Sequence, residues 1–129
     1  MKKKILVVNA NYYKEISNGL LSSALKLIEG QYIFKVIDVP GVFEIPVTIS
    51  KNLKKFDAFI ALGCVIKGQT PHFDFISQAS TTAIMTLSIE SRKPIGNGII
   101  TCLNMKQAKE RKKKGAEAAK AIISILNQR

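Results

Sequence analysis

Four apolar runs rich in β-branched residues stand out along the chain, each separated from the next by a segment with helical spacing. They cover Ile5–Val8, Tyr32–Val39, Phe56–Ile66 and Ile95–Thr101. Continuous apolar runs of this length are typical of strands that are buried on both faces. The pattern therefore predicts strands and helices that alternate in the order βαβαβαβα.

Between these runs, apolar residues recur at spacings of three and four, which is the period of a helix buried along one face. The three predicted stripes are Ile16, Leu20, Ala24 and Leu27, then Ile76, Ala79, Ala83 and Leu87, then Ala118, Ile122 and Ile125. Pro46 suits the first turn of a further short helix that runs to Leu53.

The expected fold is a three-layer α/β arrangement, a flavodoxin-like, four-stranded parallel sheet with helices on both faces. At 129 residues the chain has the size of one domain, and we expect a single domain over residues 1–129. Ligands bind beyond the carboxyl ends of the strands in such sheets. Those ends are predicted at Asn9–Tyr13, Val39–Glu44, Val65–His72 and Thr101–Asn104.

Charge and hydropathy narrow the classes of partner. The formal net charge of +11 favours an anion such as a phosphorylated metabolite, nucleic acid or an acidic surface. The basic run Lys106–Lys114 has no interleaved aromatic residue for base stacking, so we expect a solvated helix face and no nucleic-acid binding. No apolar stretch approaches the ~20 residues that span a bilayer, so no membrane association is expected.

The two cysteines point to a reducing compartment. Cys64 and Cys102 each lie in apolar, strand-like surroundings, which is typical of reduced core thiols in a cytoplasmic protein. A disulfide between them is the alternative. With a single histidine and two distant cysteines in the chain, no metal site is expected.

The segment Gly63–Phe75, GCVIKGQTPHFDF, joins a strand end, a loop and the only histidine. A histidine side chain exchanges protons near neutral pH, so His72 is the candidate proton carrier, although a histidine at a helix start also serves to cap or pack. Gly68, Gln69 and Thr70 offer backbone amides, a hydroxyl and a positive helix end, the components of a phosphate site. Alternatively, Gly68 only permits a tight turn.

Three other places are candidates from their local context. Arg111 can complete a phosphate site with paired hydrogen bonds, or it can lie on a solvated helix face. Glu44, in an otherwise apolar run, can accept hydrogen bonds from a ligand or cap a helix. Tyr12 and Tyr13 follow the first strand, where they can stack on a planar ligand or be ordinary surface tyrosines.

Two long motifs resemble the lumazine synthase family. They are VPGVFEIP at Val39–Pro46 and ALGCVIKGQTPHFDF at Ala61–Phe75. Shorter matches follow in order at Asn104–Ala108, at Glu110 and Arg111, and at Lys114 and Gly115. The resemblance covers essentially the whole chain.

The resemblance implies a transferase of riboflavin biosynthesis. Lumazine synthases condense 5-amino-6-(D-ribitylamino)uracil with 3,4-dihydroxy-2-butanone 4-phosphate and release phosphate and water, in the penultimate step of that pathway. By resemblance, this chain does the same without metal or cofactor. A non-catalytic relative that binds a flavin or lumazine is the alternative.

The resemblance also implies roles for individual residues. His72 would transfer protons, while Gln69, Thr70 and Arg111 would hold the phosphate, with Lys114 as a second basic residue nearby. The implied contacts with the ribitylaminouracil are Tyr12, Val42, Phe43, Glu44, Val65, Ile66, Lys67 and Asn97. Asn97 takes the place of a frequent pocket phenylalanine, and Tyr12 matches the aromatic residue that stacks on the pyrimidine.

In the family each site lies between adjacent subunits, so the resemblance implies a homo-oligomer in which Arg111 and Lys114 serve a neighbour's pocket. Few residues precede the first strand, and many members use an extra edge strand there. We therefore expect a homopentamer rather than an icosahedral shell. Riboflavin synthase is a further expected partner.

Overall fold

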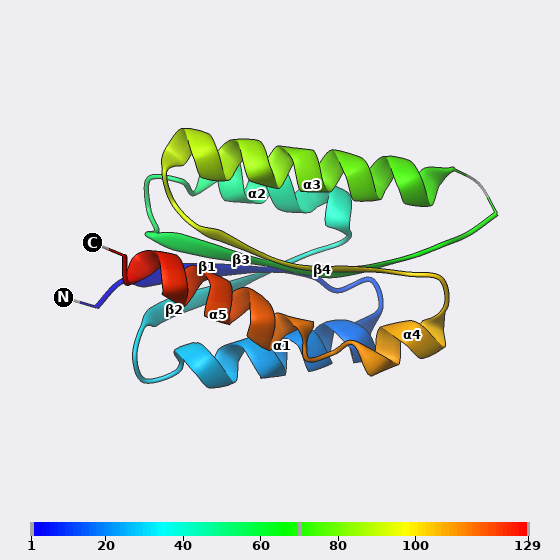
Figure 1. Cartoon of the computed structure of the whole chain (residues 1–129), viewed down its shortest axis with the longest axis horizontal. Helices are drawn as coiled ribbons and strands as arrows, with labels where there is room; N and C mark the ends of the chain where they lie inside the picture. Colours follow the sequence, from blue (N-terminus) through cyan, green and yellow to red (C-terminus); the bar gives the residue numbers. More distant parts are fainter. Residues whose placement is uncertain (1, 70, 129) are drawn as a thin grey trace.

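The computed structural model describes residues 2–69 and 71–128 and contains one parallel sheet flanked by helices (Figure 1). The strands are β1 (Lys4–Ala10), β2 (Ile33–Val39), β3 (Ala58–Ile66) and β4 (Ile95–Cys102). The helices are α1 (Lys14–Ile28), η1 (Val42–Glu44, a 3-10 turn), α2 (Ile45–Lys51), α3 (His72–Ser91), α4 (Met105–Glu110) and α5 (Lys114–Leu126). The predicted α/β three-layer fold is confirmed.

The strand order is β2-β1-β3-β4, and every neighbouring pair is parallel. The chain thus runs from β1 outward to β2, returns to the other side of β1 for β3, and ends at β4 on the opposite edge. A parallel sheet requires crossovers, and here helices supply them on both faces. The order of the strands reverses between β1 and β3, which makes this crevice the place where such sheets bind ligands.

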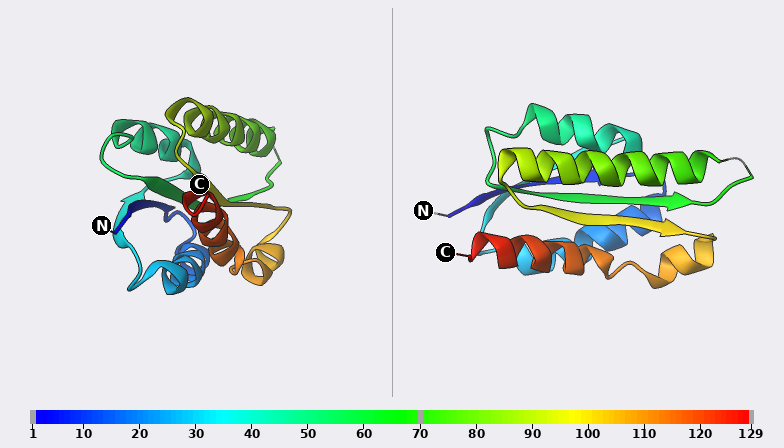
Figure 2. Two further views of the ribbon diagram at one scale, coloured as in Figure 1. Left: turned by 60° about the vertical axis from the view of Figure 1, so that its left-hand side comes forward. Right: turned by 45° about the horizontal axis from the view of Figure 1, so that its top comes forward.

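The helices form two layers, with α2 and α3 over one face and α1, α5 and α4 over the other (Figures 1 and 2). Residues on β1 alternate between them: Val7 packs in the core beneath α1 and α5, whereas Leu6 and Val8 pack beneath α2 and α3. All three are fully buried, as expected for a central strand with two covered faces.

Glycines let the backbones of α5, β4 and α1 approach closely. A Cβ atom on Gly96 of β4 would collide with the carbonyl oxygen of Ala118 in α5. Likewise, a Cβ on Gly115 would collide with the carbonyl oxygen of Leu20 in α1. The layer formed by α1 and α5 is therefore set by contacts that only glycine permits.

Most predicted elements are present, with shifts of at most two residues at strand ends. Pro46 lies in the first turn of its helix as predicted, but that helix begins at Ile45 and ends at Lys51 rather than at Leu53. Lys114 begins the last helix, whereas Arg111 does not lie within a helix. Arg111 occupies the turn after α4, because the basic run is divided among α4, this turn and the start of α5.

The predicted buried stripe on α3 is partly wrong. The buried residues of this helix are Ser80 and Ile84, while Ala79 is exposed. The apolar side chains of α3 lie on several sides of the helix, and two of them, Met85 and Ile89, are exposed. The spacing of apolar residues in the sequence therefore did not identify which face is buried. On α1 and α5 the errors are smaller, because Ile28 rather than Leu27 completes the first stripe and Ile125 is exposed.

The tight contact at Gly96 leads to a stability prediction. Gly96→Ala should lower the free energy of unfolding by about 1–3 kcal/mol, because the added methyl group meets the backbone of α5 rather than a movable side chain. Urea unfolding followed by circular dichroism measures this. Gly68→Ala is the matched control, since a Cβ there meets nothing within 4 Å, and it should be neutral or slightly stabilising. Equal stability of the two variants would contradict the close approach.

Candidate functional site

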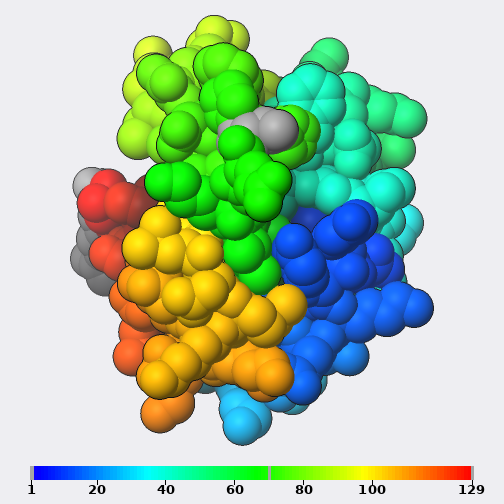
Figure 3. Space-filling model, turned by 90° about the vertical axis from the view of Figure 1, so that its right-hand side faces the viewer, coloured from blue at the N-terminus to red at the C-terminus, as the bar shows by residue number. Residues whose placement is uncertain are grey.

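The segments that follow the four strands meet at one edge of the sheet, which faces the viewer in Figure 3. There the chain after β1 (blue) borders the chain after β2 (cyan to teal) and the end of β3 (green), while the segment after β4 (gold) lies on the other side of the green segment. These residues are far apart in sequence. Parallel strands bring them together because all four carboxyl ends point the same way.

A cavity of about 570 Å³ opens at this edge, beside the crevice between β1 and β3. Its lining consists of Tyr12, Tyr13, Gly41, Val42, Phe43, Glu44, Cys64, Val65, Ile66, His72 and Ile76. We call this the β1/β3 cavity. Seven residues predicted from the sequence thus share one cavity: Tyr12, Val42, Phe43, Glu44, Val65, Ile66 and His72.

Two aromatic rings stand on one side of the β1/β3 cavity. Tyr12 is exposed, and its ring meets the ring of Tyr13 edge to face, with 4.9 Å between centroids and 83° between planes. This is a favoured geometry for two aromatic side chains. Tyr13 packs against the core, and partial burial, followed by the neighbouring Cys64 and Tyr12, raises the pKa of its phenol. Tyr13 therefore stays protonated and supports the ring of Tyr12.

His72 and Glu44 supply the ionisable groups of the cavity. His72 is the first residue of α3, and its side chain is exposed. Glu44 ends the 3-10 turn and precedes α2, but its side chain makes no hydrogen bond that caps the helix. The capping alternative for Glu44 is therefore wrong in this structure, and its carboxylate lines the cavity instead.

The loop between β3 and α3 is less enclosed. Lys67 and Gln69 are exposed and line neither this cavity nor the one described next, although the Lys67 amide donates to the Cys102 carbonyl oxygen at 2.9 Å. Thr70, the third predicted residue of this loop, lies outside the described residues. The loop thus holds Lys67 by its backbone while its side chain points into solvent.

A second cavity, about 670 Å³ in volume, lies along the edge strand β4. It is lined by Asn97, Ile99, Ile100, Thr101, Glu110, Arg111, Lys113, Lys114 and Glu117. We call this the β4 cavity. Its charged residues come from the end of α4, the turn after it and the start of α5. The Arg111 guanidinium donates to the Thr101 carbonyl oxygen at 3.2 Å. The Asn97 side chain accepts a hydrogen bond from the Ile99 amide at 3.0 Å.

The two cavities have no lining residue in common. Within one chain, therefore, the predicted residues fall into two groups, with His72 in the first and Asn97, Arg111 and Lys114 in the second. Sequence reasoning missed Lys113 and Ile76 as lining residues. The i and i+4 spacing of His72 and Ile76 on one helix was the available signal for Ile76.

Both cysteines are free and buried, on the face of the sheet that α1 and α5 cover. Among residues 2–69 and 71–128, no three His, Cys, Asp or Glu side chains are grouped so as to hold a metal ion.

Comparisons with known proteins place the chain among its relatives. The family model for 6,7-dimethyl-8-ribityllumazine synthase matches residues 2–129. The chain belongs to this family. It is 39% identical to the lumazine synthase of Bartonella tribocorum over 98% of this chain and 91% of that protein. It is 41% identical to that of Cutibacterium acnes and 42% identical to that of Methylobacterium radiotolerans, in each case over 95% of this chain and 80% of the relative.

Membership of the lumazine synthase family confirms the resemblance seen in the two long motifs. In the structure the first motif spans the end of β2, the 3-10 turn and the start of α2, and the second spans β3, the loop and the start of α3. Both motifs therefore contribute lining residues to the β1/β3 cavity. The family resemblance and the geometry select the same edge of the sheet.

The buried thiol beside the cavity yields a prediction about reactivity. Burial, with a smaller effect from the Cys102 thiol, raises the pKa of Cys64 from its ordinary value of 9.0 to about 12. At pH 8 this lowers the thiolate fraction roughly a thousandfold. We expect iodoacetamide to label Cys64 far more slowly in the native protein than in urea, as measured by mass spectrometry of its peptide. Native labelling at the unfolded rate would contradict this.

The same shift has a consequence for stability. Because the folded-state pKa of Cys64 is raised, its contribution to folding is fully present below about pH 9 and is lost as the pH rises toward 12. Cys64→Ala should remove that part of the alkaline loss, which unfolding curves at pH 8 and pH 10.5 would measure.

Proposed function

We propose that this chain is a lumazine synthase that condenses 5-amino-6-(D-ribitylamino)uracil with 3,4-dihydroxy-2-butanone 4-phosphate. The observation that carries the proposal is the convergence of Tyr12, Glu44 and His72, from three separate segments, on one cavity. An aromatic face, a carboxylate and a proton carrier are the groups that a planar, hydroxylated substrate and a series of proton transfers need. Family membership adds the identity of the substrates.

The chemistry proceeds by condensation and elimination. The uracil 5-amino group attacks the ketone carbonyl and water leaves, which forms an imine. Loss of a proton from carbon and departure of phosphate leave an enol, which takes up a proton at its terminal carbon and becomes a ketone. The ribitylamino nitrogen adds to this carbonyl carbon, and a second water leaves as the ring closes. Every step moves protons, and no step requires an external oxidant or reductant. We therefore propose no cofactor. His72 is the proton-transfer residue.

The ring substrate is proposed to lie in the β1/β3 cavity. Tyr12 stacks on the pyrimidine, and the backbone of Val65 and Ile66 meets its polar edge. Val42, Phe43 and Glu44 contact the ribityl chain, where the carboxylate accepts hydrogen bonds from hydroxyl groups. Lys67, in the loop after β3, would add positive charge near this cavity.

The phosphorylated substrate is proposed to bind at the basic residues of the β4 cavity. Arg111 and Lys114 are charged residues of the β4 cavity, and Gln69 and Thr70 belong to the loop that precedes α3. Guanidinium and ammonium groups bind phosphate through charge-assisted hydrogen bonds. Asn97, in the same cavity, occupies the wall where many family members carry phenylalanine.

A site between subunits is proposed because the two groups of residues line different cavities of one chain. The β4 cavity lies on an edge strand, where a second copy can approach. Exposed apolar side chains on the other helical layer offer a matching surface, namely Phe43, Val47, Phe75, Met85 and Ile89. Two of them, Phe43 and Val47, line a further cavity of about 470 Å³ between α2 and α3. One copy would thus supply His72 and its neighbour would supply Arg111.

The proposed assembly is a homopentamer of single-domain chains over residues 1–129, working in the cytoplasm, with riboflavin synthase as the enzyme that consumes its product. Among the described residues, no helix has both the length and the apolar character required to cross a membrane. Native mass spectrometry tests the assembly, and a monomer at working concentration would rule out a shared site.

His72→Asn should lower kcat by about 10²–10⁴-fold while product affinity changes little, because the variant loses proton transfer but keeps the cavity. The measurement is lumazine formation followed by absorbance, above the uncatalysed background. Product affinity from fluorescence titration is the internal control. Undiminished turnover would remove His72 from its role.

Arg111→Ala should weaken binding of the phosphorylated butanone by about 1.5–3 kcal/mol, the range for a hydrogen bond to a charged group. The measurement is KM for each substrate, and the KM for ribitylaminouracil should stay close to that of the unsubstituted protein. Lys26→Ala, an exposed lysine in the last turn of α1, removes the same charge away from the cavity and is the matched control. Equal effects of the two substitutions would point to net charge alone.

The second candidate is a relative that binds a flavin or lumazine without turnover. Two departures from the family resemblance favour it: Tyr13 follows Tyr12 where the usual pair ends in asparagine, and Asn97 stands in place of a frequent phenylalanine. Tyr13 lines the β1/β3 cavity and Asn97 lines the β4 cavity. Mixing the folded protein with both substrates and titrating riboflavin in parallel separates the two. Saturable acceleration establishes the enzyme, whereas riboflavin binding without acceleration establishes the binding protein.

A further inference from the structure

One face of α1 contacts the turn that carries Arg111. Residues Glu15, Gly19 and Ser23 recur at intervals of four, so they lie in line along the helix. All three contact Lys112, the residue that follows Arg111. We call these three residues the α1 clasp.

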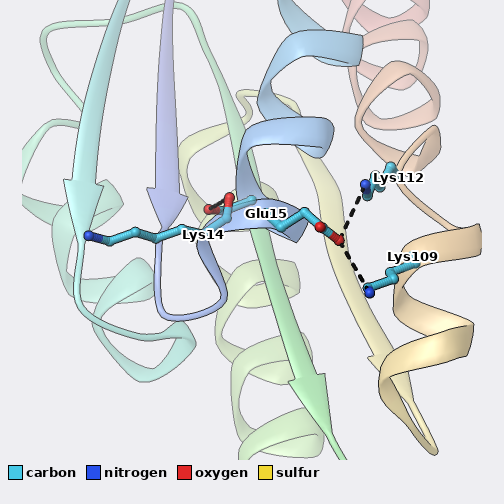
Figure 4. Close-up of polar contacts among 5 residues, drawn as sticks. Lys14, Glu15, Lys109 and Lys112 are labelled. Carbon is cyan, nitrogen blue, oxygen red and sulfur yellow. Dashed lines mark hydrogen bonds and ion pairs between the residues drawn. The ribbon is translucent and has the colours of Figure 1, made fainter.

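The first contact of the α1 clasp is electrostatic. A Glu15 carboxylate oxygen lies 3.6 Å from the Lys112 ammonium and 3.8 Å from that of Lys109 (Figure 4). Figure 4 shows the carboxylate of α1 reaching between lysines from α4 and from the turn before α5. These groups are largely exposed, so the ion pairs orient the lysines more than they stabilise the fold.

The second contact is steric. A Cβ atom on Gly19 would lie 2.5 Å from Cδ, 2.8 Å from Cγ and 3.0 Å from Cβ of Lys112. The side chain of Lys112 therefore lies flat across the backbone of α1 from its first carbon outward. Glycine is a poor helix former, and its place in the middle of α1 is explained by the room it makes for Lys112.

The third contact is a set of hydrogen bonds at Ser23. Its hydroxyl oxygen lies 3.0 Å from the carbonyl oxygen of Lys112 and 3.0 Å from that of Leu20, and it accepts from the Ala116 amide at 3.1 Å. A helical serine that reaches only its own helix gains little. Here the hydroxyl also joins α1 to Lys112 in the turn and to Ala116 in the first turn of α5.

The opposite side of the turn faces the β4 cavity. Arg111, Lys113 and Lys114 line that cavity, while Lys112 between them points to α1. Within the turn, the Arg111 amide donates to the Ala108 carbonyl oxygen and the Lys114 amide donates to that of Arg111. The Arg111 guanidinium also donates to the Thr101 carbonyl oxygen, and the Lys114 ammonium lies 3.7 Å from a Glu117 carboxylate oxygen. The α1 clasp adds the contacts that hold Lys112, and with it the backbone between Arg111 and Lys114.

We propose that Gly19 and Ser23 are positioning residues for phosphate binding: they hold Lys112 so that Arg111 and Lys114 face the phosphorylated substrate. The inference rests on the proposed function. Neither residue touches substrate, and each acts through the turn. No charge is lost when either is replaced, so an effect on anion binding would report geometry.

The test compares four substitutions. Ser23→Ala removes the hydroxyl, Gly19→Ala pushes against Lys112 while adding a better helix former, Arg111→Ala removes the guanidinium, and Ser22→Ala is the matched control. Ser22 is the neighbouring residue on α1, but its side chain is exposed and it is not part of the α1 clasp. Circular dichroism and urea unfolding establish that each variant is folded.

The readouts are the KM for each substrate and the affinity for inorganic phosphate measured by isothermal titration calorimetry. We expect Ser23→Ala and Gly19→Ala each to raise the KM of the phosphorylated butanone about tenfold, below the ~10²-fold that a misplacement of 1 Å can cost. The KM for ribitylaminouracil should stay unchanged, and phosphate affinity should fall in step. Ser22→Ala should match the unsubstituted protein.

The outcomes separate this inference from the proposed function. If Arg111→Ala weakens phosphate binding and both clasp variants leave it intact, the inference is wrong and the enzyme proposal stands. An equal rise in both KM values would also overturn it, because that indicates general loosening. Phosphate binding that depends on Ser23 and Gly19, in a chain without turnover, would support the α1 clasp while the enzyme proposal fails. No phosphate binding at all would overturn the inference directly.

Discussion

Burial of β1 and β3 on both faces is the constraint on which the rest of the structure depends. Leu6, Val7 and Phe59 are completely buried, so helices must cover the sheet above and below. Parallel strands cannot be joined by tight hairpins, and the crossovers that join them are the same helices that cover the faces. Hydrophobic burial and connectivity thus lead to one arrangement, in which all carboxyl ends share an edge.

That edge makes a site possible because it gathers short polar segments without burying them. Tyr12 follows β1, Glu44 follows β2 and His72 follows β3, and each stands just beyond a strand whose apolar residues fix it in place. The rigid sheet sets the distances, while the loops supply the chemistry. The reversal of strand order beside β1 opens the crevice into which these side chains project.

Three glycines allow close packing in the helical layer formed by α1 and α5. Gly96 brings α5 against β4, Gly115 brings the start of α5 against α1, and Gly19 leaves space for Lys112. Each contact puts backbone or a long side chain where a methyl group would collide. The result is a short turn in which Lys112 packs on α1 while Arg111 and Lys113 line the β4 cavity together with Lys114.

The sequence by itself determined the alternation of strands and helices, the sheet class and the motif-bearing loops, because apolar runs and the 3.6-residue period are local signals. It also identified seven residues of the β1/β3 cavity by resemblance. Only the tertiary structure decided which face of α3 is buried, since apolar residues surround that helix. It likewise placed Arg111 in a turn and in a different cavity from His72, and it gave Gly19 and Ser23 their contacts with Lys112. The contacts with Lys112 join segments about 90 residues apart, and packing between distant segments is encoded by no local pattern.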